Sequence, residues 1–178
     1  MQFNPIQQKQ LLDLARNVIL SHFDHHKVHK PEDPAFQEKK GVFVSLHLHG
    51  KLRGCIGYVK GVSSIVDSVV EMAHAAAFKD ERFTPVAKDE VEALDIEISI
   101  LGDMLPVASK AEIQIGRDGL MLHYRWASGL LLPQVAVEWK WDVNEYLKQI
   151  CRKTGVPDGS WSAEGAVLYR FEAQVFGS

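Results

Sequence analysis

The segment GVFVSLHLHGKLRGCIGY at residues 41–58 limits the possible folds more than any other part of the chain. Aliphatic side chains occupy every second position of residues 42–48, which is the period of a half-buried β-strand. Gly50 and Lys51 then supply a two-residue turn, because glycine adopts the unusual backbone angles that such turns need. We therefore predict that residues 42–48 and 52–58 form two neighbouring antiparallel strands.

The second of these strands is unusual, because Gly54 and Gly57 flank Cys55. Glycine weakens a strand, so the pair indicates close packing, a tight bend or room for a ligand. On a regular strand Arg53 and Cys55 point to the same face, and a guanidinium beside a thiol favours the nucleophilic thiolate. Cys55 is therefore a candidate nucleophile. The alternative is that Cys55 is a small buried side chain and the glycines mark a bulge.

The histidines of the hairpin are poor candidates for a base that would activate Cys55. A regular two-residue turn sets Cys55 beside Val44 or Leu46 on the first strand. His47 and His49 then lie on the opposite face of the sheet. We expect neither of them to form a Cys–His pair.

The remaining patterns predict a mixture of helices and antiparallel strands. Apolar residues at helical spacing predict a helix from Pro5 that ends before Pro31, and another that Ser63 or Ser64 caps. Asp142 and Gly155 bracket a helix through Thr154 with Cys151 on its buried face. Further strands are expected at residues 93–101, 129–132 and 167–176, with a hairpin around Asp118 and Gly119. The strands follow one another through hairpins, so the expected class is α+β with antiparallel sheets.

Composition excludes several kinds of function. The 178 residues carry a net charge of -3, which gives no electrostatic basis for binding nucleic acid or an anionic membrane. No apolar run reaches the roughly 18 residues of a membrane span, and the first residues lack the pattern of a signal peptide. Cys55 and Cys151 make no disulfide framework, so we expect a cytoplasmic protein. Two cysteines cannot supply the ligands of an iron–sulfur cluster, and we expect no cofactor.

The hexapeptide LRGCIG at residues 52–57 resembles the signature of the AMMECR domain family, whose prokaryotic members are called AmmeMemoRadiSam system protein A. The resemblance continues, in the family's order, through a series of further blocks. Together they cover residues 5–176, so a chance match is excluded. The blocks are GVFVSL, AAFKDERFTPV, LDIEISIL, IGRDGL, GLLLPQVAVEWKWD, YLKQICRKTGVP and YRFEAQVF.

The resemblance implies a fold and two hypotheses about function. Residues 5–176 would form one AMMECR-type domain of two lobes, intertwined in sequence, with antiparallel β-sheets flanked by helices. The signature cysteine would lie at an inter-lobe cleft. The first hypothesis is a cleft-based enzyme or small-ligand-binding protein that acts with a Memo-type protein and a radical SAM protein. The second is a non-catalytic adaptor or scaffold for those partners. The oligomeric state is left open.

The resemblance also marks positions that would contact a ligand, each with a structural alternative. Arg82 could instead pair with Asp80 and hold the turn before Pro85, and we favour that alternative. Glu97 could pair with a cation across the sheet. Two polar residues near Pro133 could merely solvate a helical turn. The ligand-contact candidates are Arg53, Gly54, Gly57, Arg82, Glu97, Gln134 and Glu138.

A cluster of histidines precedes Pro31 in the segment SHFDHHKVHK. Among His22, His25, His26 and His29 several pairs are three or four residues apart, so three of them could share one face of a helix. Imidazole nitrogens at this spacing suit zinc, nickel or copper. The cluster lies outside the blocks that resemble the family, and cationic side chains are favoured near a helix end in any case. We therefore predict that it holds no physiological metal.

Overall fold

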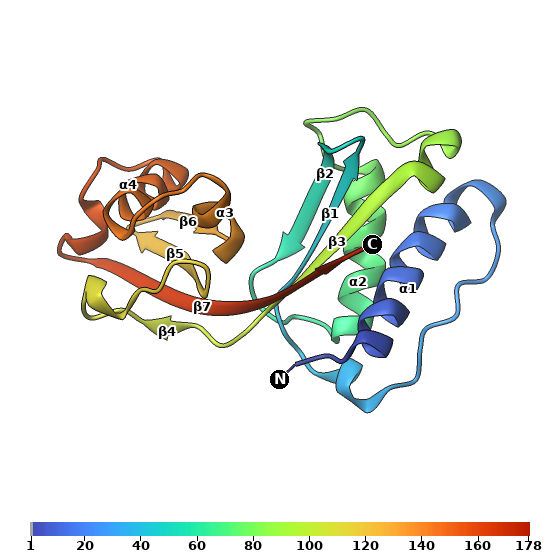
Figure 1. The fold of residues 1–178 in the computed structure, drawn as a ribbon, viewed down its shortest axis with the longest axis horizontal. Helices are drawn as coiled ribbons and strands as arrows, with labels where there is room; N and C mark the ends of the chain where they lie inside the picture. The colour runs from blue at the N-terminus through green and yellow to red at the C-terminus, as the bar shows by residue number, and fades with distance from the viewer. Residues whose placement is uncertain (1) are drawn as a thin grey trace. The chain divides into compact units, whose positions relative to one another are not determined.

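Contacts along the chain separate residues 2–178, which the computed structural model describes, into two units. Unit 1 takes the chain up to Leu101 together with Gln174–Ser178, and unit 2 takes Gly102–Ala173. Strand β7 (Ala166–Gly177) contributes to both, because the boundary between the units falls within it. Figure 1 shows the order of the elements along the chain.

The first helix of unit 1, α1 (Pro5–Asp24), begins and ends where its sequence directs. The Asn4 side chain accepts hydrogen bonds from the backbone N–H groups of Ile6 and Gln7, and Pro5 occupies the first turn, where its missing N–H costs nothing. At the other end His25 adopts a left-handed conformation with φ of 57°. The helix therefore stops before Pro31, as predicted.

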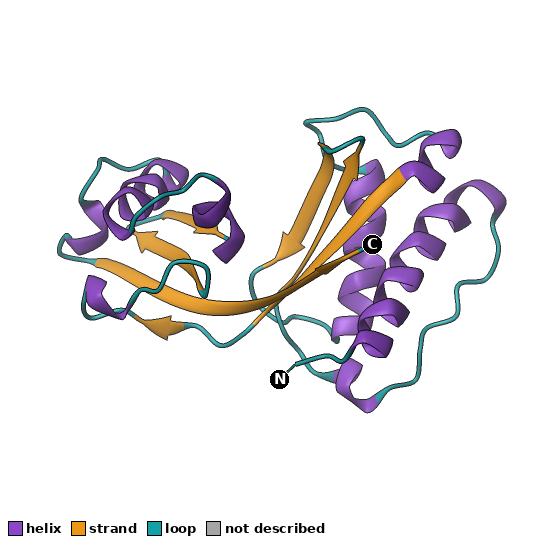
Figure 2. Cartoon of the chain, in the orientation of Figure 1, coloured by secondary structure: helices purple, strands orange, loops and turns teal. Residues whose placement is uncertain are grey.

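The sheet of unit 1 is antiparallel and carries its helices on one face (Figure 2). The order of its strands is β2 (Lys51–Tyr58), β1 (Val42–Leu48), β3 (Leu94–Leu101) and the end of β7. Helix α2 (Ile65–Phe78), capped by Ser64, packs on β1 and β2, and α1 packs on β3. Short 3₁₀ turns, η1 (Pro34–Gln37) and η2 (Lys88–Ala93), precede β1 and β3. The predicted hairpin and the α+β class are confirmed.

The turn and the register of this hairpin differ from the prediction. The turn residues are His49 and Gly50, both with positive φ, so Lys51 already belongs to β2. The register then shifts beyond His47, because Arg53 is an extra residue that pairs with nothing on β1. Such a bulge moves every later side chain to the other face. Cys55 consequently lies opposite Ser45 rather than Val44 or Leu46.

The two glycines of β2 are explained by packing. A Cβ atom at Gly54 would lie 2.1 Å from the carbonyl oxygen of Ala76, so α2 rests directly on this point of the strand. A Cβ atom at Gly57 would lie 2.3 Å from the ring of Phe43, which occupies the space above that residue. Both distances are far below normal contact, so neither position accepts a side chain without movement of its neighbour.

Unit 2 is also built from antiparallel strands. Strand β5 (Asp118–Tyr124) lies between β6 (Ala127–Leu131) and β7, and β4 (Leu105–Pro106) also pairs with β7. Helices α3 (Pro133–Glu138) and α4 (Val143–Thr154) and the 3₁₀ turns η3 (Lys110–Glu112) and η4 (Ser160–Ser162) complete the unit. Asp142 caps α4, and Cys151 on this helix is fully buried, as predicted.

The predicted hairpin around Asp118 and Gly119 is wrong. Strand β5 begins at Asp118, and its hairpin partner is β6, joined by a turn at Arg125 and Trp126. The Asp118 carboxylate is buried and accepts a hydrogen bond from the backbone N–H of Gln114, so this residue closes the turn that precedes the strand. Within residues 2–178, no helix is both long enough and apolar enough to cross a membrane.

The packing of Gly54 against α2 predicts the effect of a small substitution. Replacing Gly54 by Ala should lower the free energy of unfolding by about 1–3 kcal/mol, because a methyl group would force the strand and helix apart. Denaturant unfolding measures the change. The matched control is Gly50→Asn, since nothing lies within 4 Å of an added Cβ there and asparagine tolerates a positive φ. Equal losses from both variants would contradict this account.

Candidate functional site

The bulge places Cys55 in a row of polar side chains that crosses three strands of unit 1. Ser45 on β1 lies between Cys55 on β2 and Glu97 on β3 in the register of the sheet. These residues share the face opposite α1 and α2, because their neighbours Val44 and Ile96 belong to the buried core beneath the helices. His47 lies on the same face of β1 as Ser45, and therefore on the same face of the sheet as Cys55. The prediction that His47 and Cys55 lie on opposite faces is wrong.

Cys55 is partly exposed, and its thiol has a polar neighbour. Cys55 is half-buried, whereas Cys151 is buried. The Ser45 hydroxyl lies 3.1 Å from the Cys55 sulfur and donates a hydrogen bond to it. Ser45 itself is buried, so its hydroxyl has a fixed environment. The Ser45 hydroxyl therefore gives the sulfur a polar contact, which a thiol enclosed by apolar side chains lacks.

The backbone of Cys55 is held on its outer side by the residues that follow α2. Strand β2 is the edge of the sheet in unit 1, so its outward N–H and C=O groups lack a neighbouring strand. The N–H of Cys55 donates to Asp80 Oδ2 over 2.9 Å. The carbonyl of Cys55 accepts from Arg82 Nη2 over 3.1 Å. Asp80 and Arg82 thus take the place of a further strand at this residue.

Asp80 and Arg82 are also bound to each other. The Asp80 carboxylate accepts from Arg82 Nε at 2.9 Å and from Arg82 Nη2 at 2.7 Å. The pKa of Asp80 falls far below its usual value of 3.8, chiefly because of these bonds from Arg82, while burial opposes the shift and the N–H of Cys55 adds to it. The ion pair favoured for Arg82 in the sequence is therefore present, and it also contacts Cys55.

Arg53 does not offer a free charge to a ligand in this structure. Its Nε and Nη2 atoms bind the two carboxylate oxygens of Glu90 at 3.0 and 2.8 Å. Its Nη1 and Nη2 atoms also donate to the carbonyls of Thr84 and Pro85. As the extra residue of the bulge, Arg53 turns toward the segment after α2 and fastens it to β2. The pKa of Glu90 is lowered, mainly by these bonds.

The structure brings only some of the candidate ligand contacts together. Cys55, Arg82 and Glu97 lie in unit 1 on or beside the row described above. Gly54 faces α2 and Gly57 lies beneath Phe43, so neither leaves the backbone open as expected. Gln134 and Glu138 lie on α3 of unit 2, where Glu138 is exposed, and their contact with a ligand stays a prediction.

The histidine cluster does not form one face of a helix, because α1 ends at Asp24. Only His22 lies in the helix, where its ring stacks on Phe78 with 3.9 Å between centroids. His26 contacts the Asp24 carboxylate instead. Within residues 2–178 no three His, Cys, Asp or Glu side chains are arranged to hold a metal ion.

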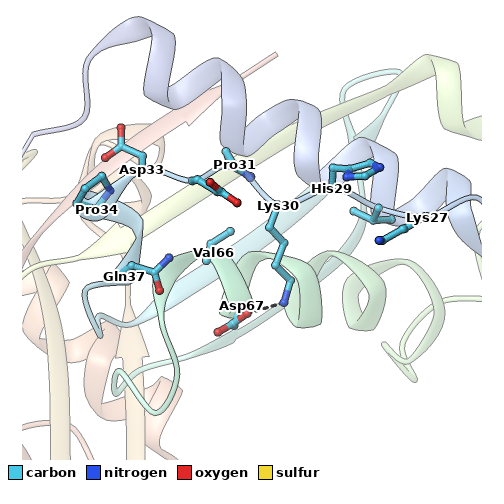
Figure 3. Close-up of a pocket in the computed structure, with 11 residues that line it drawn as sticks. Lys27, His29, Lys30, Pro31, Asp33, Pro34, Gln37, Val66 and Asp67 are labelled. Atoms are coloured by element: carbon cyan, nitrogen blue, oxygen red, sulfur yellow. Dashed lines mark hydrogen bonds and ion pairs between the residues drawn. The ribbon is translucent and has the colours of Figure 1, made fainter.

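Residues 27–34, which include His29, line an open hollow of about 750 Å³ beside the first turn of α2 (Figure 3). Lys30 crosses it to form an ion pair of 2.7 Å with Asp67. Both side chains of that pair are about half exposed, so the hollow is a solvated surface feature.

Two residues that carry the site could not be assigned a role from the sequence. The alternation of the strand sets Cys55 beside Val44 or Leu46 and so puts Ser45 on the other face of the sheet. No periodic pattern reveals the one-residue bulge that brings Ser45 and Cys55 together. Glu90, which binds Arg53, lies 37 positions from it in the sequence, so only the fold brings the two together. Asp80 stands in the block AAFKDERFTPV, and its acceptor role follows from its position just after the end of α2.

The structure places the LRGCIG signature on the edge strand of an α+β unit. Comparison with known proteins identifies the family that has this signature. The sequence model of the AMMECR1 family matches residues 12–176, so the chain belongs to that family. It is 42% identical over 175 residues to a protein of Methanothermobacter thermautotrophicus, covering 93% of this chain and 91% of that one. Protein MJ0810 of Methanocaldococcus jannaschii is 43% identical over 171 residues, with coverage of 91% and 85%. The crystal structure of the uncharacterized protein PH0010 from Pyrococcus horikoshii superposes with a TM-score of 0.87 at 36% identity, covering 94% of this chain and 89% of that chain.

The bonds of Asp80 predict a specific dependence of stability on pH. Because its pKa is lower in the folded chain than in the unfolded one, Asp80 stabilises the fold above its unfolded pKa. That contribution is lost as pH falls from about 5 to about 2. In Asp80→Asn the free energy of unfolding at neutral pH should drop by about 1–3 kcal/mol, and its decline over this acid range should be shallower than in the wild type. Denaturant unfolding at a series of pH values measures both.

The control for this experiment is Asp13→Asn, which removes an exposed i,i+4 ion pair with Lys9 on α1. Its free energy of unfolding should change by less than about 0.5 kcal/mol. A wild-type pH profile that Asp80→Asn leaves unaltered would show that Asp80 does not carry the linkage.

Proposed function

We propose that this chain is an enzyme or small-ligand-binding protein in which the thiol of Cys55 is the reacting or contacting group. The observation that supports this most is the half-buried Cys55 with the Ser45 hydroxyl directed at its sulfur on the strand face opposite the helices. A cysteine that served packing alone would resemble Cys151, which is fully buried on α4. Thiols that react are partly exposed and have polar neighbours.

The chemistry that suits this arrangement is attack of the sulfur on an electrophilic atom of a ligand. The backbone of Cys55 is held at both its N–H and its C=O and the sulfur accepts a hydrogen bond from Ser45, so the residue presents its thiol from an ordered strand as a ligand approaches. Glu97 lies two strands away in the same row and supplies a carboxylate on that face. These groups support a covalent or thiol-assisted reaction without identifying its substrate.

The finer parts of the proposal follow from the family resemblance. A cleft between the two lobes, with Gln134 and Glu138 as contacts from unit 2, stays a prediction. So does joint action with a Memo-type protein and a radical SAM protein. The free thiols of Cys55 and Cys151 suit a reducing compartment such as the cytoplasm.

A second candidate function is a non-catalytic adaptor for those partners. The exposed apolar side chains of unit 2 favour it, since large exposed aromatics are typical of protein interfaces. Trp126 at the β5–β6 turn is 90% exposed and Trp139 after α3 is 66% exposed. An adaptor would retain partner binding when Cys55 is replaced by Ser, whereas an enzyme with a cysteine nucleophile would lose its activity.

The proposal predicts that Cys55 reacts in the folded protein. Iodoacetamide at neutral pH should modify one thiol per chain, and peptide mass spectrometry should locate it at Cys55. Cys151 should react only after denaturation, because it is fully buried. The variant Cys151→Ser controls for the second thiol and should be modified at the same rate as the wild type.

A Cys55 that stays unmodified under native conditions would contradict the proposal and leave the packing explanation standing. Mass-resolved analysis of protein purified with its partners is the companion experiment. It should find a small molecule or adduct that the wild type retains and Cys55→Ser loses.

A further inference from the structure

Arg82, rather than Arg53, is the cation that remains available beside Cys55. The side chain of Arg53 is 14% exposed, and each of its three nitrogens donates to Glu90 or to a carbonyl group. The side chain of Arg82 is 57% exposed. Its Nε and Nη2 atoms bind Asp80 and Cys55, but Nη1 donates no hydrogen bond within residues 2–178. One edge of this guanidinium therefore faces solvent with its donors unused.

This unused edge is held in a fixed place relative to the thiol. Arg82 Nη2 bonds the carbonyl of Cys55 itself, so the guanidinium is attached to the residue that carries the sulfur. The two bonds from Asp80 set the plane of the guanidinium. The pKa of Arg82 is raised, mainly by its hydrogen bonds to Asp80.

We propose that the Cys55 site takes ligands that carry an oxyanion, a carboxylate or a phosphate, and that Arg82 Nη1 binds this group while the thiol faces the reacting atom. The inference rests on the proposed function, since it names the ligand class of that same site. A charged N–H donor forms a short, strong hydrogen bond to an oxyanion, and the N–H groups of Arg82 Nη1 have no acceptor within residues 2–178. Asp80 offsets part of this attraction, but its side chain is only 4% exposed whereas that of Arg82 is 57% exposed, so an incoming ligand meets the cation of the pair first.

Two alkylating reagents that differ only in charge test this inference. Iodoacetate and iodoacetamide react with a thiolate in the same way: a sulfur–carbon bond forms, the carbon–iodine bond breaks and iodide leaves. Only iodoacetate carries a carboxylate. The ratio of their rate constants at Cys55 therefore reports how strongly the site attracts an oxyanion, independently of how reactive the thiol is.

In Arg82→Gln the ratio of the iodoacetate rate to the iodoacetamide rate should fall about tenfold, the lower end of the loss expected for one charge-assisted hydrogen bond. The matched control is Arg152→Gln, because the Arg152 side chain is also 57% exposed and also pairs with an aspartate. It should leave the ratio unchanged. Inorganic phosphate at constant ionic strength should slow iodoacetate in the wild type but not in Arg82→Gln.

Loss of Arg82 alone leaves the buried Asp80 carboxylate without its main partner, which could destabilise the fold. A second variant controls for this effect. The double variant Asp80→Asn with Arg82→Gln removes both charges and keeps an acceptor for the N–H of Cys55. It should show the same fall in the ratio. An unchanged ratio in both variants, or an equal fall in Arg152→Gln, would overturn the inference and leave the proposed function intact. A wild-type Cys55 inert to both reagents would overturn the proposed function as well.

Discussion

The hydrogen bond from the N–H of Cys55 to the Asp80 carboxylate is the interaction on which the arrangement of this site depends. It joins the edge strand β2 to the residue that follows the end of α2. That contact requires the helix to lie very close to the strand, and Gly54 provides the closeness because a Cβ atom there would meet the backbone of Ala76. Gly54 and Asp80 therefore act together to attach β2 to the end of α2.

Arg82 adds two further contacts to this attachment of β2 to α2. It neutralises the buried carboxylate of Asp80 and closes the outer side of Cys55 through the carbonyl group. An edge strand with free N–H and C=O groups is prone to pair with other chains, so this closure also protects the sheet. The half of Arg82 that stays exposed is what gives the thiol a cationic neighbour.

The bulge at Arg53 decides which side chains meet. Without the extra residue, Cys55 would point beneath the helices and Arg53 would stay in the strand. With it, Cys55 joins Ser45 and Glu97 on the opposite face. Arg53 instead reaches Glu90 and fastens the segment between α2 and β3 to the sheet. Arg53 therefore has a structural role, and Arg82 is the accessible arginine beside Cys55.

The sequence predicts strands from the alternation of their side chains and helix ends from their capping residues. The alternation of residues 42–48, the cap at Ser64 and the left-handed Gly155 locate strands and helices because each acts over a few neighbouring residues. A bulge leaves no periodic signal, so the partner of Cys55 was mispredicted. The role of Arg53 depends on Glu90, which only the fold brings near. The pair of Asp80 and Arg82 is local, and the sequence therefore indicated it correctly.

The central claim is that Arg82 and Cys55 together form a site for an oxyanion-bearing ligand. The most direct measurement is a crystal structure of the protein carboxymethylated at Cys55 with iodoacetate. The account predicts that the carboxylate of the adduct lies within hydrogen-bond distance of Arg82 Nη1, with the bonds of Asp80 preserved. An adduct whose carboxylate turns to solvent, or which draws Arg53 away from Glu90, would contradict it.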